Sequence, residues 1–148
     1  MELNTDWKQF VESLNSNGVE CILVGALAVA HHAIPRNTGD IDFFVRRDQE
    51  NAEKIVKAIE EFGFGSLNLK PDDFMVEDCV IQLGVSPRRI DLINNLTGVS
   101  FDDAWREKEE MYFGGVRLFV ISRKHLLANK RALGRHKDIA DIESIEGD

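Results

Sequence analysis

The stretch Ile22–Val45 constrains this chain most, because one apolar segment stops there at Gly25 and another begins at Asp40-Ile41-Asp42. A short helical pattern fills the interval between the two segments. Successive side chains of a β-strand point to opposite faces, so Asp40 and Asp42 are expected on the same face. Two carboxylates this close repel each other, and a divalent cation is the natural partner for the pair.

A third carboxylate, Asp91, lies in the later apolar segment 89–93. Together the three Asp residues indicate a metal-dependent site for phosphoryl or nucleotidyl transfer, since two cations about 4 Å apart can stabilise the attacking and leaving oxygens. Magnesium keeps several waters and takes phosphate oxygens, so three carboxylates suffice. Asp40 and Asp42 are expected to bridge both ions, and Asp91 to accept the attacking group's proton. The alternative for Asp91 is an ion pair with Arg89 on the same strand face.

Size and composition are those of an ordinary globular protein. The 148 residues predict a single domain, residues 1–148, with one core. No apolar run approaches the roughly 20 residues of a membrane span, and residues 1–10 show no secretory pattern. Cys21 and Cys79 stand apart without a CxxC spacing, which predicts free buried thiols and a cytoplasmic location.

Charge is unevenly distributed. The formal net charge is −8, yet residues 111–137 hold seven Lys or Arg and no Asp or Glu. An acidic body argues against a long duplex nucleic acid as partner. The basic segment can hold a triphosphate beside an acidic metal site, or it can be the solvated face of a helix.

The spacing of apolar residues predicts alternating helices and strands. Helices are expected at residues 5–17, 25–33, 49–62, 101–106, 123–133 and 139–145, and strands at residues 19–24, 41–45, 75–83, 89–93, 111–113 and 116–120. Residues 64–74 are expected to form a loop, and Gly114-Gly115 a tight turn between the last two strands. Because helices alternate with strands early and a hairpin comes late, the pattern predicts an α/β fold with a mixed sheet.

The tripeptide Val24-Gly25-Ala26 predicts a phosphate-binding turn. A strand enters a helix directly at this point, and Gly25 lets the backbone approach a ligand closely. The first N–H groups of the helix then form an anion site near the acidic pair. The alternative is a tight strand–helix turn beside a solvated strand end.

Several basic residues are candidate phosphate ligands. Lys130 lies beside the apolar face of its helix, where a lysine either points at an anion or extends to solvent, and we favour a triphosphate contact. Arg135, His136 and Lys137 follow at the next helix junction and can contact phosphate or base, or form a solvated turn. Arg36 precedes the acidic pair and can clamp a phosphate.

Four other residues receive structural interpretations. Asp138 is expected to cap the last helix, and Asp141 to pair with Lys137 four residues earlier. His31 and His32 are interpreted as helix-end residues rather than ligands.

Four motifs occur in order along the chain: Val24-Gly25-Ala26, Pro35-Arg36-x-Thr38-x-Asp40-Ile41-Asp42, Pro87-x-Arg89-Ile90-Asp91-Leu92 and Lys130-x-x-x-Gly134-Arg135-x-Lys137-Asp138. Together they resemble the small stand-alone prokaryotic nucleotidyltransferases of the DNA polymerase beta superfamily. The resemblance implies a nucleotidyltransferase-like mixed β-sheet flanked by helices, with a C-terminal helical pair. It also implies two Mg²⁺ ions and transfer of a nucleoside monophosphate from a nucleoside triphosphate such as ATP to an acceptor, releasing pyrophosphate.

By this resemblance Asp40, Asp42 and Asp91 correspond to the metal ligands, and Gly25 and Ala26 to the triphosphate-binding turn. We also expect the second motif to contribute Thr38 to nucleotide binding. The family usually has Gly or Ser where this chain has Ala26. The backbone N–H survives this change, and the lost hydroxyl contact is worth about 1 kcal/mol.

The acceptor is left open between a small molecule, a protein and an RNA end, because members of the family modify all three. Some members are toxins beside an antitoxin partner. The alternative function is a non-catalytic nucleotide-binding regulatory protein or toxin–antitoxin partner protein. A phosphatase with an aspartyl nucleophile is disfavoured, because Asp40 precedes its strand instead of ending one.

Overall fold

The computed structural model describes residues 5–35 and 37–147. It contains the helices α1 (Thr5–Ser16), α2 (Gly25–His32), α3 (Gln49–Ile59), α4 (Phe101–Arg106), α5 (Arg123–Leu133) and α6 (His136–Glu146). Its strands are β1 (Cys21–Val24), β2 (Asp40–Val45), β3 (Val80–Leu83), β4 (Arg89–Ile93), β5 (Glu109–Phe113) and β6 (Val116–Val120). Between α3 and β3 lie three short helical turns, η1 (Glu60–Phe64), η2 (Gly65–Leu67) and η3 (Pro71–Phe74).

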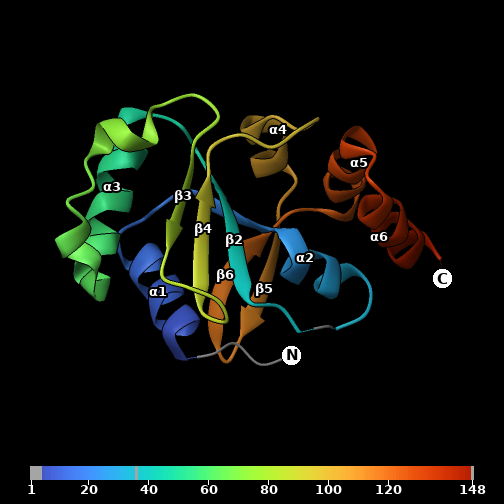
Figure 1. Cartoon of the computed structure of the whole chain (residues 1–148), viewed down its shortest axis with the longest axis horizontal. Coiled ribbons are helices and arrows are strands. Elements are labelled where there is room, and N and C mark those ends of the chain that lie inside the picture. The colour runs from blue at the N-terminus through green and yellow to red at the C-terminus, as the bar shows by residue number, and fades with distance from the viewer. Residues whose placement is uncertain (1–4, 36, 148) are drawn as a thin grey trace.

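The strands form one six-stranded mixed sheet in the order β3-β4-β2-β1-β6-β5. β2 runs parallel to β4 and β1 parallel to β6, whereas the other neighbours are antiparallel. Helices α1 and α3 lie on one side of this sheet, and α2, α5 and α6 lie on the other (Figure 1). The predicted α/β fold with a mixed sheet and a C-terminal helical pair is confirmed.

The core fills the space between the sheet and the helices α1 and α3. Phe10 of α1 is fully buried, and its ring centroid lies 6.5 Å from that of Phe43 on β2. The ring of Phe62, just after α3, packs edge-on against the ring of Phe10, with 5.2 Å between the ring centroids. Burial of such aromatic side chains supplies a large share of the stabilisation of a domain this size.

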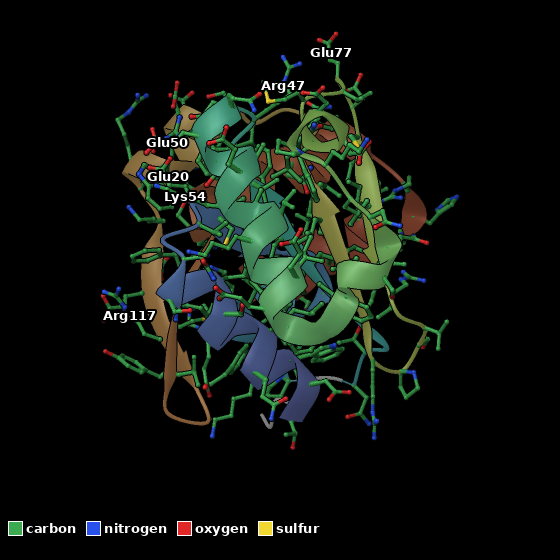
Figure 2. All side chains as sticks on the ribbon, turned by 90° about the vertical axis from the view of Figure 1, so that its left-hand side faces the viewer. Glu20, Arg47, Glu50, Lys54, Glu77 and Arg117 are labelled. Atoms are coloured by element: carbon green, nitrogen blue, oxygen red, sulfur yellow. The ribbon has the colours of Figure 1, made fainter. Side chains whose placement is uncertain are left out.

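The outer face of α1 and α3 carries charges of both signs (Figure 2). Lys54 and Glu50 form an ion pair on α3, with Nζ and Oε1 3.3 Å apart. Glu20 accepts a hydrogen bond of 2.6 Å from Arg46. The basic helix α5 lies on the opposite side of the sheet (Figure 1).

The third strand is shorter than predicted, beginning at Val80 instead of Met75. Asn94 holds the preceding residues in a turn: its amide donates to the carbonyl oxygens of Phe74 and Val76, and its Oδ1 accepts from the Cys79 N–H. The strand predicted from Met75 therefore loses its first five residues, because the side chain of Asn94, distant in sequence, takes up their backbone groups.

Helix α3 also ends differently from the prediction. Regular helix stops at Ile59, and a wider π-type turn continues to Phe64 through Gly63, whose φ is 117°. Phe62 still packs against the core, which explains why its spacing resembled helix. The predicted loop at residues 64–74 contains the two short turns η2 and η3.

Two further observations concern membranes and thiols. Among residues 5–35 and 37–147, no helix combines the length and the apolar character needed to cross a bilayer. Cys21 and Cys79 are free thiols, as expected, but both are only partly buried.

Candidate active site

Strand pairing brings the three predicted carboxylates together. In the parallel register of β2 and β4, Asp42 lies directly opposite Asp91, and Asp40 lies on the same face two residues earlier. Each of the three offers a carboxylate oxygen, and these oxygens lie within 4.8 Å of one another. Asp91 is buried, whereas Asp40 and Asp42 are half-buried.

This crowding changes the acidity of the central carboxyl group. The pKa of Asp42 is raised to about 7, first by burial of the side chain and then by the negative charges of Asp40 and Asp91. Like charges so close together favour either a bound proton or a bound cation. Three oxygen ligands converging from two neighbouring strands fit a hard divalent cation such as magnesium.

Arg89 also belongs to the carboxylate cluster. From the sequence, Arg89 is expected there only as the alternative partner of Asp91. Its Nε donates to Asp91 Oδ1 at 2.9 Å, and its Nη2 donates to Asp91 Oδ2 at 3.1 Å and to Asp40 Oδ2 at 2.7 Å. The ion pair is therefore present together with the carboxylate cluster. The sequence signal was the two-residue spacing of Arg89 and Asp91, while the contact with Asp40 depends on strand pairing.

Gly25 begins α2 with a φ of 72°, a conformation that side chains disfavour. An ideal Cβ on Gly25 would overlap the carboxylate of Asp42. The preceding residue, Val24, provides no side-chain hydrogen bond to the start of α2. The predicted turn thus places the uncapped N–H groups of a helix beside the acidic pair.

A cleft of about 640 Å³ lies between the carboxylates and the C-terminal helices. This volume is in the range of small-molecule sites. Its lining includes the backbone turn and acidic pair on one side and side chains of α5 and α6 on the other: Val24, Gly25, Ala26, Asp40, Asp42, Val80, Ile93, Asn95, Leu96, Thr97, Asn129, Lys130, Leu133, Arg135, Lys137 and Asp141.

Two candidates from the loop before β2 have different outcomes. Arg36 lies outside the described residues. Thr38 is placed beside the cluster, where its Oγ1 donates to Asp40 Oδ1 at 2.9 Å. Thr38 therefore orients Asp40 in this structure.

Lys130 lines the cleft but does not extend to solvent. The residue is only 7% exposed, and its Nζ lies 3.1 Å from Asp141 Oδ2 and 3.5 Å from Asp138 Oδ1. Its partner Asp138 also accepts hydrogen bonds from the side chain of Arg135, the closest at 2.6 Å. The hydrogen bonds from Arg135 are the main reason that the pKa of Asp138 is lowered to about 2. Two cations and two carboxylates are thus combined in one network on the cleft wall.

Two acidic residues of this network differ in their contacts from the structural interpretations. Arg135, not Asp138, is the residue before the first turn of α6, and Asp138 lies three residues further on, where it accepts a hydrogen bond from the Arg135 backbone N–H. Asp141 forms an ion pair with Lys130, whereas Lys137 was its predicted partner. The pairing with Lys130 arises because α6 folds back beside α5 after Gly134, which brings Lys130 to the acidic side chains of α6.

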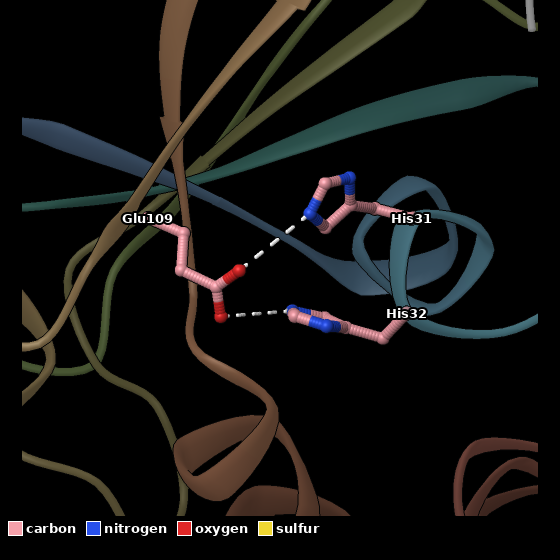
Figure 3. Close-up of side chains that lie close together, drawn as sticks. All are labelled: His31, His32 and Glu109. Atoms are coloured by element: carbon pink, nitrogen blue, oxygen red, sulfur yellow. Dashed lines mark ion pairs between the residues drawn. The ribbon is translucent and has the colours of Figure 1, made fainter.

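A second group of candidate metal ligands lies at the C-terminal end of α2, outside the cleft lining. The carboxylate of Glu109 faces the rings of His31 and His32, at 3.8 and 3.9 Å from their Nε2 atoms (Figure 3). The Nε2 of His32 also forms a 2.7 Å hydrogen bond with the carbonyl oxygen of Ile121. That nitrogen is engaged with the backbone, which supports the interpretation of this pair as helix-end residues.

The mixed six-stranded sheet with helices on both sides is a nucleotidyltransferase-like α/β fold. The chain belongs to the family described as nucleotidyl transferase of unknown function (DUF2204), whose model matches residues 4–147.

Solved structures support the same fold. A "putative nucleotidyltransferase" from Thermotoga maritima is 17% identical, with a TM-score of 0.59 over 92% of this chain and 87% of that one. An antigenic nucleotidyltransferase-like protein from Paracoccidioides brasiliensis is 15% identical, with a TM-score of 0.53 over 98% of this chain and 78% of that one. No curated protein matches the chain. At these identities the likeness shows the fold alone.

Proposed function

We propose that this protein is a magnesium-dependent nucleotidyltransferase that transfers a nucleoside monophosphate from a nucleoside triphosphate to an acceptor and releases pyrophosphate. The observation that carries the proposal is the position of Asp40 and Asp42 in one cleft with the glycine turn, with Asp91 directly opposite Asp42. Anion-binding backbone and cation-binding carboxylates face the same space, as a complex of metal and triphosphate requires.

We assign two magnesium ions to Asp40, Asp42 and Asp91. The fit rests on the oxygen chemistry of the three side chains and on their mutual distances. It also rests on the raised pKa of Asp42, which burial causes first and the charges of Asp40 and Asp91 second. When bound, magnesium supplies charge neutralisation for the triphosphate and the leaving group.

The residues of the chain have separate tasks in this proposal. N–H groups of Gly25 and Ala26 hold a phosphate at the start of α2, while Arg135 and Lys137 approach from the opposite wall with positive charge. The loop residues Arg36 and Thr38 complete the expected nucleotide site.

The chemical step is an in-line displacement at the α-phosphorus. An acceptor oxygen or nitrogen forms the new bond to phosphorus, and the bond to the oxygen bridging to the β-phosphate breaks. Pyrophosphate leaves with the electron pair of that bond. The proton of the acceptor passes to the carboxylate of Asp91, which makes this residue the general base.

Lys130 contributes through its charge in this arrangement. Its Nζ is held by Asp138 and Asp141, so a triphosphate must either share it or replace one carboxylate. The positive field of Lys130 in the cleft is therefore reduced by the two carboxylates beside it.

The acceptor stays open between a small molecule, a protein and an RNA end. A cytoplasmic location, an antitoxin partner and the organisation of residues 1–148 as a single domain also stay predictions. The alternative, a non-catalytic nucleotide-binding protein, is supported by the engagement of Asp40 and Asp91 with Arg89.

Transfer of label separates the two functions. The purified chain is incubated with each α-³²P-labelled nucleoside triphosphate, magnesium and a cell extract, and products are separated by size and charge. An enzyme labels an acceptor in the wild type but not in Asp42→Asn or Asp91→Asn. The control Asp72→Asn changes an exposed carboxylate of η3 and should retain transfer. Nucleotide binding without transfer in any extract would support the alternative.

A further inference from the structure

Arg89 occupies the carboxylate cluster in the way that a cation would. Its guanidinium group makes a two-pronged contact with both oxygens of Asp91 and reaches Asp40 Oδ2 with the same Nη2. Such bidentate, charge-assisted contacts are among the strongest hydrogen bonds in proteins. The contacts follow from the strand register, because Arg89 lies directly opposite Asp40 and two residues before Asp91.

Few carboxylate oxygens in the cluster are left unengaged. Thr38 donates to Asp40 Oδ1, and Arg89 takes Asp40 Oδ2 and both oxygens of Asp91. A divalent ion that binds all three carboxylates must therefore compete with the guanidinium group for the same oxygens. The Arg89 side chain is 33% exposed, whereas the Asp91 side chain is 8% exposed. Arg89 is the more exposed of the two, so it has room to turn toward solvent while Asp91 stays in place.

We propose that Arg89 is a built-in counter-cation, a positioning residue that holds Asp40 and Asp91 together without metal and releases Asp91 when a divalent ion binds. The inference rests on the proposed function, because it assigns the metal to this cluster. Arg89 then has two effects. It lowers the affinity of the cluster for the divalent ion, and it neutralises the carboxylates before metal and substrate bind. Metal binding thus involves replacement of one cation by another.

The neighbouring residue provides a matched control. Arg88 lies just before β4, and its Nη1 is 3.6 Å from Asp6 on α1, on the other side of the sheet from the cluster. Arg88→Gln therefore removes the same charge and the same side chain from the adjacent position. It should leave the cluster intact.

Binding of Mn²⁺ to the full-length chain, followed by the electron paramagnetic resonance of the free ion, tests the proposal. Arg89→Gln should bind Mn²⁺ about tenfold more tightly than the wild type, because a competing positive charge is gone. Arg88→Gln should match the wild type. Unchanged or weaker binding in Arg89→Gln would overturn the proposal, since Arg89 would then be neutral or helpful for the ion.

Two additional variants separate failure of this proposal from failure of the metal site itself. If the wild type binds Mn²⁺ and Asp91→Asn does not, the site stands, and Arg89→Gln alone decides the role of Arg89. If neither the wild type nor Arg89→Gln binds Mn²⁺, both proposals are wrong. If Arg89→Gln does not fold, Arg89→Lys replaces it. Lysine keeps the positive charge but lacks the two-pronged guanidinium group, so Arg89→Lys should bind Mn²⁺ about threefold more tightly than the wild type. Equal or weaker binding in Arg89→Lys would then reject the proposal.

Discussion

Gly25 and Asp42 are so close that a Cβ on Gly25 would overlap the carboxylate of Asp42. The backbone of the turn therefore packs directly against the carboxylate of Asp42, with no space for a side chain between them. Any side chain at position 25 must move the turn or the carboxylate.

We therefore expect Gly25→Ala to lose nucleotide transfer. We also expect it to destabilise the chain by more than alanine alone costs at a positive φ, which is about 1 kcal/mol. Gly115→Ala is the matched control, because Gly115 has a φ of 83° but open space around its Cβ position. Urea unfolding and the labelled-nucleotide assay measure both effects. If Gly25→Ala and Gly115→Ala lose the same stability, the overlap of the new Cβ with Asp42 adds no destabilisation, and this prediction is wrong.

The pH dependence of stability should report the crowding at Asp42. Its pKa is raised from 3.8 to about 7 by folding, so the folded state binds one more proton than the unfolded state between these values. The Asp42 contribution to stability is therefore fully present below pH 4 and falls as pH rises to 7, by up to about 1.4 kcal/mol per pH unit. Asn is a neutral mimic of the protonated carboxyl group.

Without metal, Asp42→Asn should be as stable as the wild type near pH 4 and more stable at pH 8. Urea unfolding in the presence of a chelator at several pH values measures this difference. Lower stability of Asp42→Asn at pH 8 would contradict the raised pKa.

Lys130→Met should destabilise the chain strongly. The substitution leaves two carboxylates, the fully buried Asp138 and the 7% exposed Asp141, without the lysine charge between them. Breaking a buried pair in this way costs about 3–5 kcal/mol. The control Arg131→Met removes an exposed pair with Glu146 and should cost less than about 1 kcal/mol. Chemical unfolding measures both variants, and similar small losses would show that the Lys130 network is well solvated.

The two adjacent histidines should differ in their importance. His32 is held to the Ile121 carbonyl oxygen and its side chain is 7% exposed, whereas the side chain of His31 is 28% exposed. We expect His32→Ala to cost about 1–3 kcal/mol, because a buried carbonyl loses its partner, and His31→Ala to cost less. Thermal unfolding of the two variants at pH 8 measures the difference. A larger effect of His31→Ala would point to a role for this cluster other than closing the end of α2.

Local sequence patterns were sufficient to predict most helices and strands and to place Asp40 and Asp42 as a pair on one strand face. Apolar spacing placed the strands at 89–93 and 116–120, and alternation along a strand put Asp40 and Asp42 on one face. The start of a helix directly after a strand, at Gly25, also follows from nearby residues. These features were predictable because they depend on the geometry of a few consecutive residues.

Pairings between distant segments could not be predicted in the same way. The start of β3 depended on Asn94, more than ten residues later, and the partners of Lys130 depended on the return of α6 beside α5. The position of Lys130 on its helix predicts a phosphate contact, whereas in the structure Asp138 and Asp141 already hold its Nζ.

The sequence by itself determined which elements form, which face of β2 is acidic and where a helix can begin directly after a strand. Only the tertiary structure decided that β4 lies beside β2 in the register that sets Asp91 against Asp42 and Arg89 against Asp40. Periodicity is a local property, whereas strand order and register come from burying apolar surfaces across the whole chain, and a shift of one residue would move Asp91 to the other face.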